Sequence, residues 1–441
     1  MTKRLSLADM RAMQTDLLAF AQQAAREQNA QGYTQYNMLG TPLFFIFRPE
    51  LMRELLVKQS DKLHRDPFVS RAFRRVLGNG VFIAEGEAWK RQRRLVQPAF
   101  HSMRIREYVE TMAAYTREMV TGWAEGEVVA INTAFNQLTM RIIAKTMYGV
   151  DLASQTAELG RLMQIILGVM EEQLSQTIIW PMWVPTAQNR RQGQAMREVR
   201  TLLSQIVQER RASGRDEGDL LSMLLLARDE AGQPMEEELL LDELITLFFA
   251  GHETTAVALA WLSHLLTSHP EVTDRLTAEI EQTIGQRPIT FADLADLTYL
   301  DAVIKETLRL YPPAFGFGRE VQEPFTIGQT EFPRKAVLLF NSYITHRDPT
   351  LYDQPDRFWP DRFLQEETRP DKYAYFPFGI GSRICLGNMF AQMETAVICA
   401  TLLQTVQLTR ADAVPVEIDT VVTLRPKQPL HLQVEHRPSM R

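Results

Sequence analysis

A chain of 441 residues is long enough to bury a large core, and 45% hydrophobic with 23% charged residues is ordinary for a globular rather than a disordered protein. The formal net charge of -6 lacks the basic surplus that phosphate neutralisation requires, so we expect no nucleic-acid partner. Length alone suggests about three domains, but no internal repeat or low-complexity linker divides the chain, so a single domain over residues 1–441 is the simplest prediction.

The N-terminal residues lack the features of a membrane anchor or a secretory signal. Charged side chains recur between Lys3 and Asp16, whereas a spanning helix needs about 20 mostly apolar residues and a signal an unbroken apolar stretch of about 7–15. The two cysteines, Cys385 and Cys399, are too few for a disulfide framework, which agrees with a reducing compartment. We therefore expect a cytoplasmic protein without a transmembrane anchor.

Amphipathic helical patterns dominate the first half of the chain, and strand-like runs are short and scattered. A strand is expected at residues 43–47 and amphipathic helices at residues 109–123, 131–148 and 196–211. Residues 176–185 are strongly apolar and lie between two helical patterns. They form either a buried loop or an exposed lid that touches a membrane or admits apolar ligands.

Ahead of these helices, Trp89 and Arg93 lie one turn apart in a further helical stretch. That spacing lets both side chains reach one group, and a guanidinium suits a carboxylate because it can bind it bidentately. The neighbouring Lys90, Arg91 and Arg94 either offer a basic face to an acidic protein partner or form a solvated helix face.

The longest predicted helix covers residues 239–266, and the polar segment AGHETT at residues 250–255 interrupts its apolar middle. Buried hydroxyls and carboxylates need partners, so such a segment marks either a hydrogen-bonded core network or a functional site. Ala250 and Thr254 share one helix face, where a small residue beside a hydroxyl leaves room for a diatomic ligand. Thr254 can also bond back to the carbonyl one turn earlier, which opens the helix locally.

The region that follows combines another helix with short strands. The helix at residues 299–310 carries Glu306 and Arg309 three positions apart, a pair worth only about 0.2–0.5 kcal/mol on a surface. Arg319 and Arg362 follow where proline and glycine are frequent, and strands are expected at residues 337–341, 421–424 and 430–434. The predicted fold class is mainly α with small β-sheets.

The clearest chemical motif is the run FGIGSRICLG at residues 378–387, which precedes a helical pattern at residues 388–403. The glycines before Cys385 allow a tight turn with positive φ, and Gly387 lets a flat ligand approach the backbone. A cysteine just before a helix meets unpaired amide groups and the helix dipole, which favour the thiolate. Such a thiolate is a soft ligand for iron, and Arg383 adds a cation suited to a carboxylate.

The two cysteines could also have roles other than binding iron. Cys385 could be a free buried thiol on a glycine-rich turn, although the motif is long for such a turn. Cys399 lies among Ala396, Val397, Ile398 and Ala400 and is expected to be a packed core thiol. Neither cysteine has the paired cysteine or histidine spacing of a zinc site.

At every fixed position the run 378–387 resembles the haem-binding loop of the cytochrome P450 family, Phe-Gly-x-Gly-x-Arg-x-Cys-x-Gly. The resemblance extends from about residue 41 to residue 430, with the motifs in the expected order, and is greatest to the soluble bacterial branch related to fatty-acid hydroxylases. It implies the cytochrome P450 fold, an α-helical domain with a smaller β-rich region around a buried haem.

The resemblance also implies roles for individual residues. Cys385 would be the iron ligand, Glu253 and Thr254 would deliver protons, and His252, at a variable position of the family motif, would be structural or solvent-facing. The residues implied to contact the haem are Trp89, Arg93, Ala250, Arg319, Phe378, Gly379, Arg383 and Gly387. The residues implied to hold the cysteine loop in place are Glu306, Arg309 and Arg362.

By the same resemblance, substrate contacts are expected from Phe82, Phe248, Ala250, Ala314, Phe315 to Phe317, and residues 421–423 including Val422. These positions are apolar or small, so the pocket would select by shape and hydrophobicity. The implied reaction inserts one oxygen atom from dioxygen into a fatty acid, terpenoid or similar lipophilic substrate. Haem b (iron protoporphyrin IX) would be the cofactor.

The chain continues for too short a distance past Cys385 to contain a fused reductase, which would need roughly 100 residues. Electrons from NAD(P)H are therefore expected through a separate ferredoxin or flavodoxin and its reductase, and the protein is expected to be a monomer. Two alternatives are a peroxide-dependent haem-thiolate enzyme or isomerase, and a non-catalytic haem-based ligand-binding protein. Glu253 and Thr254 argue against the first, and the lack of an output domain argues against the second.

Overall fold

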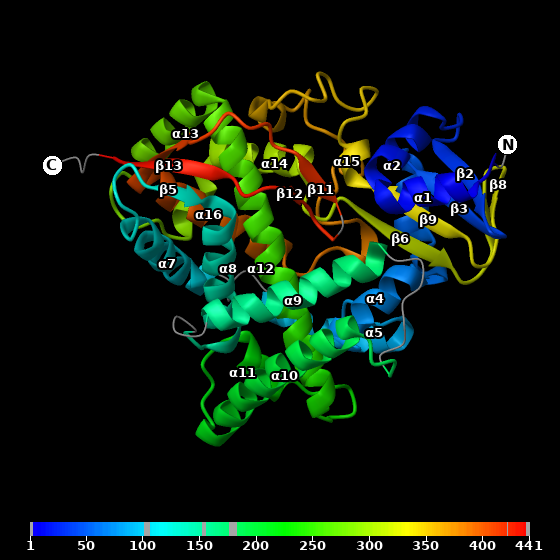
Figure 1. Cartoon of the computed structure of the whole chain (residues 1–441), viewed down its shortest axis with the longest axis horizontal. Helices are drawn as coiled ribbons and strands as arrows, with labels where there is room; N and C mark the ends of the chain where they lie inside the picture. Colours follow the sequence, from blue (N-terminus) through cyan, green and yellow to red (C-terminus); the bar gives the residue numbers. More distant parts are fainter. Residues whose placement is uncertain (1–2, 101–105, 152–155, 176–182, 421, 438–441) are drawn as a thin grey trace.

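The computed structural model describes residues 3–100, 106–151, 156–175, 183–420 and 422–437. Helices make up 56% of the structure, and several small sheets accompany them. In Figure 1, long helices cross through the middle of the molecule and the largest sheet lies at the right, beside the N-terminus. This confirms the predicted class, mainly α with small β-sheets.

The helices of the described chain vary from one turn to nearly nine. They are α1 Leu7–Thr15, α2 Leu17–Arg26, α3 Pro49–Arg53, α4 Pro67–Leu77, α5 Gly86–Val96, α7 Val109–Thr121, α8 Ile131–Tyr148, α9 Thr156–Ser175, α10 Ala187–Ser213, α11 Leu220–Leu226, α12 Glu237–Ser268, α13 Pro270–Thr283, α14 Thr298–Leu310, α15 Ser342–Thr345 and α16 Asn388–Thr405. All five longer helical patterns of the sequence lie on such helices, and residues 388–403 form most of α16.

The strands of the described part of the chain are short and belong to four sheets. They are β1 Lys3–Arg4, β2 Tyr33–Met38, β3 Thr41–Ile46, β4 Leu63–Arg65, β5 Val128–Ala130, β6 Gly316–Val321, β7 Phe325–Ile327, β8 Thr330–Phe332, β9 Val337–Asn341, β10 Val406–Arg410, β11 Ile418–Thr420, β12 Leu424–Pro426 and β13 His431–His436. The largest sheet has the order β1-β2-β3-β9-β6-β4, in which β4 and β6 are antiparallel neighbours.

The strand predictions at residues 43–47, 337–341 and 430–434 correspond to β3, β9 and β13. The prediction at residues 421–424 is wrong for residues 422 and 423, holds for Leu424 at the start of β12, and at residue 421 lies outside the described residues. Residues 422 and 423 lie between β11 and β12, which pair in antiparallel fashion with Thr420 opposite Leu424. A short apolar run fits a strand and a hairpin tip equally well, because its periodicity cannot be read over so few residues.

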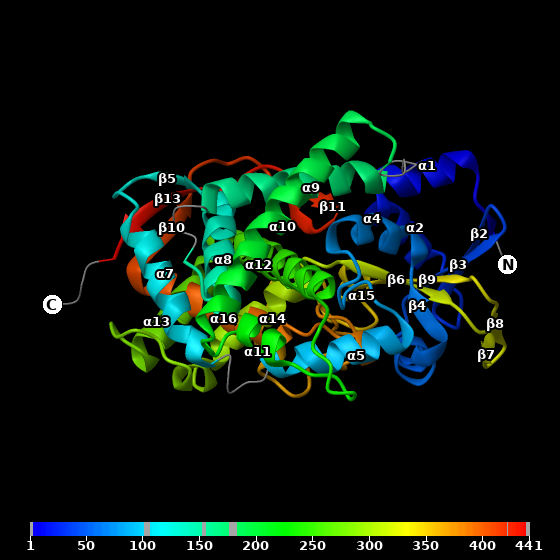
Figure 2. The ribbon, with the colours of Figure 1, turned by 90° about the horizontal axis from the view of Figure 1, so that it is seen from below.

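Helix α12 is the central element, with α8 and α16 beside it (Figures 1 and 2). Glu237 and Glu238 in its first turn complement the helix dipole. The Tyr148 hydroxyl at the end of α8 donates to the Leu244 carbonyl at 2.7 Å, and Trp261 Nε1 donates to the Leu424 carbonyl at 2.8 Å. These bonds fix α12 before and after residues 250–255.

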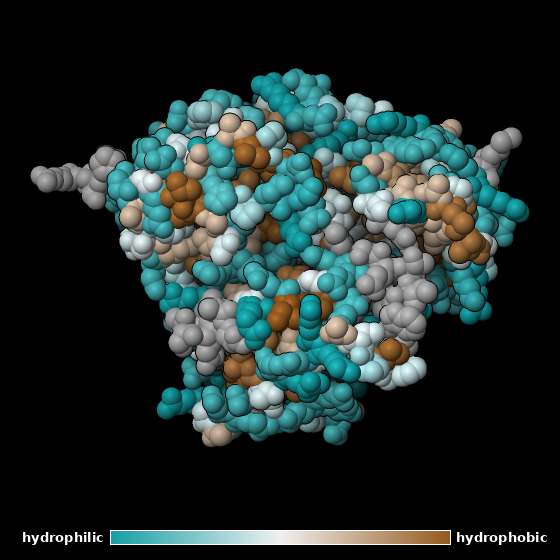
Figure 3. Space-filling view, viewed as in Figure 1, coloured by the Kyte–Doolittle hydropathy of each residue, from teal (hydrophilic) through white to brown (hydrophobic). Residues whose placement is uncertain are grey.

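Hydrophobic residues on the face seen in Figure 3 form separate patches within a mainly hydrophilic surface. Among the described residues, α12 is the one helix with a length and composition that would permit it to cross a membrane, and 83% of its apolar window is buried inside the protein. Core helices of globular proteins have the same composition. Most of the apolar segment at residues 176–185 lies outside the described residues, and at its described end Trp183 is 82% exposed.

Candidate active site

The cysteine loop has the predicted tight geometry. Gly379 and Gly381 adopt φ values of +79° and +76°, which glycine tolerates and other residues rarely adopt. A Cβ atom on Gly381 would also lie 2.1 Å from the Leu56 carbonyl oxygen, so the backbone of the loop approaches the protein too closely for any side chain. The Cys385 amide donates to the Phe378 carbonyl at 2.9 Å and closes the loop.

Cys385 lies just before α16, whose N-cap is Gly387. Burial is the largest influence on the thiol and raises the pKa of Cys385, while the Gly387 amide and the Arg93 guanidinium lower it. Cys385 is nevertheless exposed, so the loop leaves this residue open to a ligand. A metal ion supplies the positive charge that would hold such a thiol as a thiolate.

Cys399 is confirmed as a packed core thiol. It lies on α16, is 4% exposed, and burial raises the pKa of its thiol to about 12. A thiol of this kind stays protonated and does not compete with Cys385 for a metal.

Three arginines meet beside the cysteine loop, with Arg319 buried and Arg65 and Arg383 half-buried. Arg65 on β4 and Arg319 on β6 are cross-strand partners, and Arg383 follows in the loop. Burial and the neighbouring arginines lower the pKa of all three guanidinium groups, to about 10 for Arg319. The carboxylate that faces them is Glu85, which pairs with Arg383 and accepts from the Arg65 amide at 2.9 Å.

This arginine cluster has more positive than negative charge. Among the described residues Arg65 Nε has no hydrogen-bond partner. Buried cations are costly unless they are paired, so the cluster suits a ligand that carries carboxylates. No local sequence pattern marks Arg65 or Glu85 as a site residue, because only the pairing of β4 with β6 brings Arg65 to Arg319.

Trp89 and Arg93 on α5 reach the same loop. The Arg383 guanidinium lies 4.0 Å from the centre of the Trp89 ring, and the Arg93 guanidinium lies 5.7 Å from it. Arg93 Nη1 also donates to the Ile384 carbonyl at 3.1 Å. The structure therefore brings together Trp89, Arg93, Arg319, Arg383 and Cys385, which the sequence distributes over almost 300 positions.

The AGHETT segment presents a small residue and a hydroxyl on one side of α12. Ala250 is exposed and Thr254 half-buried, although most of the helix around them is buried. The Thr254 hydroxyl donates to the Ala250 carbonyl at 2.9 Å, the back-bond expected for a threonine at this spacing. Glu253 is 6% exposed and accepts from Asn136 Nδ2 on α8 at 3.1 Å.

His252 is not solvent-facing. It is fully buried, its ring packs on Phe248, and desolvation lowers its pKa. Its Nδ1 lies 2.9 Å from the Phe248 carbonyl oxygen. Because a carbonyl only accepts, Nδ1 carries the hydrogen and Nε2 of the neutral ring is an acceptor.

Glu306, Arg309 and Arg362 form one buried charged group. Arg309 Nε lies 2.7 Å from one carboxylate oxygen of Glu306, and Arg362 Nε lies 3.6 Å from the other. The remaining donors of Arg309 bind the carbonyls of His346, Pro355 and Arg357. A pair that would be weak on a surface is here satisfied on all sides and fixes the chain segments around it.

His346 connects this charged group to the cysteine loop, a role that no local sequence pattern indicates. Burial lowers its pKa to about 3, so the ring is neutral. Nδ1 lies 3.1 Å from the Arg309 carbonyl, and Nε2 accepts from the Phe376 amide at 3.0 Å. The imidazole thus joins α14 to the residues that precede Phe378.

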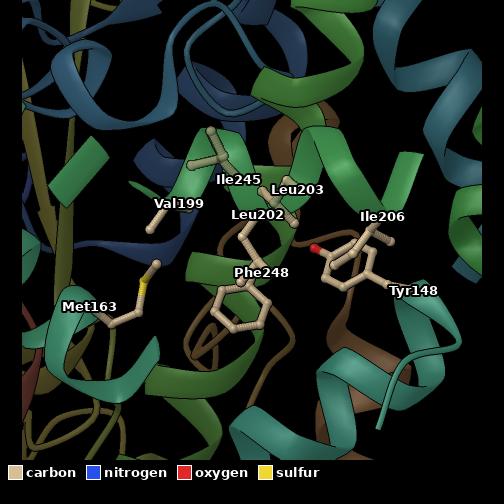
Figure 4. Close-up of a pocket in the computed structure, with 8 residues that line it drawn as sticks. All are labelled: Tyr148, Met163, Val199, Leu202, Leu203, Ile206, Ile245 and Phe248. Carbon is tan, nitrogen blue, oxygen red and sulfur yellow. The ribbon is translucent and has the colours of Figure 1, made fainter. Parts of the chain in front are cut away.

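Two of the residues expected in the substrate pocket face elsewhere. Phe248 lies two positions before Ala250, which turns it about 200° around α12. It stacks on Tyr148 and lines an apolar pocket among α8, α9 and α10 of about 10 Å³, roughly the room of one water (Figure 4). Phe315 packs in a core cluster with Trp261 and Tyr343.

The remaining substrate positions differ in exposure. Ala314 and Gly316 are exposed, like Ala250, while Val422 is half-buried and packs against the main core. Phe82 packs on Phe73, with the Arg65 guanidinium 4.1 Å from its ring centre. Phe82 therefore lies close to the arginine cluster.

The basic residues of α5 are paired with acids. Lys90 binds Glu87 at 2.6 Å, Arg91 binds Asp229 at 2.8 Å, and Arg94 pairs with Glu230. These ion pairs agree with the second of the two predictions for this cluster, a solvated helix face.

Comparison with known proteins gives a consistent result. The family model for Cytochrome P450 matches residues 21–434. The chain is 35% identical to a cyclooctat-9-en-7-ol 5-monooxygenase from Streptomyces melanosporofaciens over 80% of this chain and 77% of that protein. It is 31% identical to a pentalenene oxygenase from Streptomyces avermitilis over 85% of this chain and 84% of that protein.

A solved structure agrees in fold. The retinoic acid bound cyanobacterial CYP120A1 superposes with a TM-score of 0.87 and 25% identity, over 97% of this chain and 96% of that chain. With the accessible cysteine and the arginine cluster in the positions described, the chain belongs to the cytochrome P450 family, the haem-thiolate monooxygenases that act on lipophilic substrates.

Proposed function

We propose that this chain hydroxylates a cyclic terpenoid. The names of two relatives, the cyclooctat-9-en-7-ol 5-monooxygenase and the pentalenene oxygenase, support a terpenoid rather than a straight-chain acid. The exposed small residues Ala250, Ala314 and Gly316 suit a bulky apolar ring, because they offer apolar surface without filling the space. The reaction places one oxygen atom of dioxygen in a C–H bond and reduces the other to water.

We propose that haem b is the cofactor and that Cys385 is its iron ligand. Arg65, Arg319 and Arg383, with Trp89 and Arg93, would hold the propionates, since buried guanidinium groups with one facing carboxylate fit a dianionic ligand. Ala250, Phe378, Gly379 and Gly387 would flank the ring. When bound, the haem supplies the iron that activates dioxygen.

Thr254 and Glu253 would move protons in this reaction. The Thr254 hydroxyl donates to the Ala250 carbonyl, so its lone pairs are free to accept a hydrogen bond on the open side of α12. Glu253 lies on the neighbouring face, where Asn136 orients it. Among the described residues the two side chains do not bond to each other, so a water would link them.

Glu306, Arg309 and Arg362 would be structural, with no direct part in the chemistry. We further propose a monomeric cytoplasmic protein with one catalytic domain that receives electrons from NAD(P)H through a ferredoxin or flavodoxin and its reductase. The basic face of α5 would contribute little to partner binding, because its charges are paired.

The observation that carries the proposal is the accessible Cys385 on a glycine loop beside the arginine cluster. The test is the absorption spectrum of the reduced, carbon-monoxide-treated protein, followed by titration with pentalenene. We expect the shifted band of thiolate-ligated haem, and a further spectral change when the terpene displaces iron-bound water. An unshifted absorption band in the reduced, carbon-monoxide-treated protein would overturn the haem-thiolate assignment. A spectral change on titration with lauric acid but not with pentalenene would overturn the terpenoid assignment.

A further inference from the structure

The loop at residues 78–85 packs closely against α12. Gly78 adopts a φ of +56°, and a Cβ atom there would lie 2.1 Å from Asp242 Oδ2. A Cβ atom on Gly80 would lie 2.3 Å from Thr246 Oγ1. Glycine at these two positions permits the backbone of the loop to approach the helix closely.

Two adjacent carboxyl groups of α12 hold this loop by its backbone amides. The Asn79 amide donates to Asp242 Oδ2 at 2.7 Å, and the Val81 amide donates to Glu243 Oε2 at 3.0 Å. Asp242 also pairs with Arg200 on α10. Glu243 is 0% exposed, and among the described residues its Oε1 has no hydrogen-bond partner. A buried carboxyl with an unpaired oxygen costs stability, so a gain in stability does not explain why a carboxyl holds the loop here.

Phe82 follows directly after the amide that Glu243 holds. Val81, Ile83 and Ala84 are buried, whereas Phe82 is half-buried. Of these four loop residues, Phe82 is therefore the one with side-chain surface left for a ligand.

The loop connects the open face of α12 to the arginine cluster. Glu243 precedes Ala250 by seven positions, two turns of α12, so both lie on one face of the helix, about 10 Å apart along its axis. At the other end of the loop, Glu85 accepts from the Arg65 amide at 2.9 Å. The guanidinium of the same arginine lies 4.1 Å from the centre of the Phe82 ring. Phe82 thus lies between two parts of the candidate active site.

We propose that Glu243 is a positioning residue for substrate binding, which fixes the orientation of the Phe82 ring by holding the Val81 amide. This inference rests on the proposed function. A ring that is held in place before binding loses less conformational freedom when a ligand packs on it, so the ligand binds more tightly. Loss of the acceptor at position 243 frees the Val81 peptide and with it the Phe82 ring. The loss of one such hydrogen bond corresponds to about five- to tenfold in a dissociation constant.

The experiment measures the dissociation constants of imidazole and N-phenylimidazole for the haem-loaded protein by absorption titration. Both ligands bind the iron through a nitrogen, but only the phenyl ring extends into the pocket. Glu243→Leu removes the acceptor, whereas Glu243→Gln keeps an acceptor oxygen at the same place. Glu279→Leu is the matched control, because Glu279 on α13 likewise accepts backbone amides of another segment, those of Tyr299 at 2.7 Å and Leu300 at 2.9 Å.

We expect Glu243→Leu to weaken the binding of N-phenylimidazole about fivefold and to leave that of imidazole unchanged. Glu243→Gln and Glu279→Leu should bind both ligands as the wild type does. In a Phe82→Ala background, Glu243→Leu should have no further effect, because the effects of two residues that act through one contact do not add. Should Glu243→Leu fail to bind haem, Glu243→Met, which keeps the length of the side chain, takes its place.

Three results would overturn the inference while leaving the proposed function intact. They are unchanged binding of N-phenylimidazole by Glu243→Leu, an equal weakening of both ligands, and the same fivefold loss in the Phe82→Ala background. Failure of the haem-thiolate assignment would look different, since the wild-type protein would then lack the thiolate band before any ligand is added. Pentalenene has no part in these titrations, so failure of the terpenoid assignment would leave their result unchanged.

Discussion

The Thr254 hydroxyl donates to the Ala250 carbonyl while its oxygen stays half-exposed on the open side of α12. We predict that Thr254→Ala keeps its haem but diverts NADPH to peroxide, because the site loses its hydrogen-bonding group. Product formation should fall by roughly ten- to a hundredfold. Peroxide and product measured per NADPH consumed provide the check.

Thr255→Ala is the matched control for this prediction. Thr255 has the same back-bond, to the Gly251 carbonyl at 3.2 Å, but it is 2% exposed. Equal uncoupling in both variants would indicate a disturbed helix rather than a lost proton path.

Glu243 is a buried carboxyl on α12 whose pKa burial raises from 4.5 to about 7, while the Val81 amide, which donates to it at 3.0 Å, lowers it. Between these two values the folded protein keeps a proton that the unfolded chain releases. Stability therefore falls as pH rises through this window and is constant above it.

We predict that Glu243→Gln removes the fall in stability with rising pH, because glutamine does not ionise. Relative to wild type, the variant should gain on the order of 2 to 3 kcal/mol of unfolding free energy between pH 5 and pH 8. Urea unfolding of the variant and the wild type at pH 5 and pH 8 measures this difference in unfolding free energy. A constant difference between the two proteins would show that Glu243 is ionised in the folded state at both values.

At the scale of elements, β4 and β6 matter because their pairing places Arg65 opposite Arg319. We predict opposite effects of Arg65→Gln on the two forms of the protein. The haem-free form should gain about 1–3 kcal/mol, since a buried cation among like charges is removed, while the loaded form should lose haem faster. The melting temperature of the haem-free form tests the first effect. The rate of haem transfer from the loaded form to apomyoglobin tests the second.

Arg190→Gln on α10 is the control, because that arginine is exposed. A haem-free Arg65→Gln protein that melts at a lower temperature than wild type would contradict the charge argument. Unchanged haem transfer would exclude Arg65 from the propionate contacts.

Elements also differed in how far sequence patterns predicted them. The long helices are recognisable because their apolar period extends over several turns, as in residues 131–148, which are α8 without any change of bounds. In the short run at residues 421–424, for which the pattern predicts a strand, Val422 and Thr423 lie between β11 and β12 and only Leu424 belongs to a strand. Its place depends on the pairing of β11 with β12, which no local pattern records.

At the scale of the whole molecule, segments distant in the chain meet at one site. α5, β4, β6, α12 and the cysteine loop each contribute a side chain to it. We predict that haem removal lowers the melting temperature by roughly 10 °C, because the ligand binds only the folded arrangement. Calorimetry of loaded and haem-free protein tests this, and equal melting temperatures would contradict it.

The sequence by itself determined the motifs that depend only on residues close together in the chain. The glycines around Cys385, the AGHETT segment and the Trp89–Arg93 spacing are each set by neighbouring residues, and they carried the family assignment. Tertiary structure alone decided the surroundings of these motifs. It brought Arg65 to Arg319 and joined His346 to the cysteine loop. The reason is physical: charge, burial and unmet hydrogen bonds depend on which distant segments pack together, and a linear pattern does not contain that information.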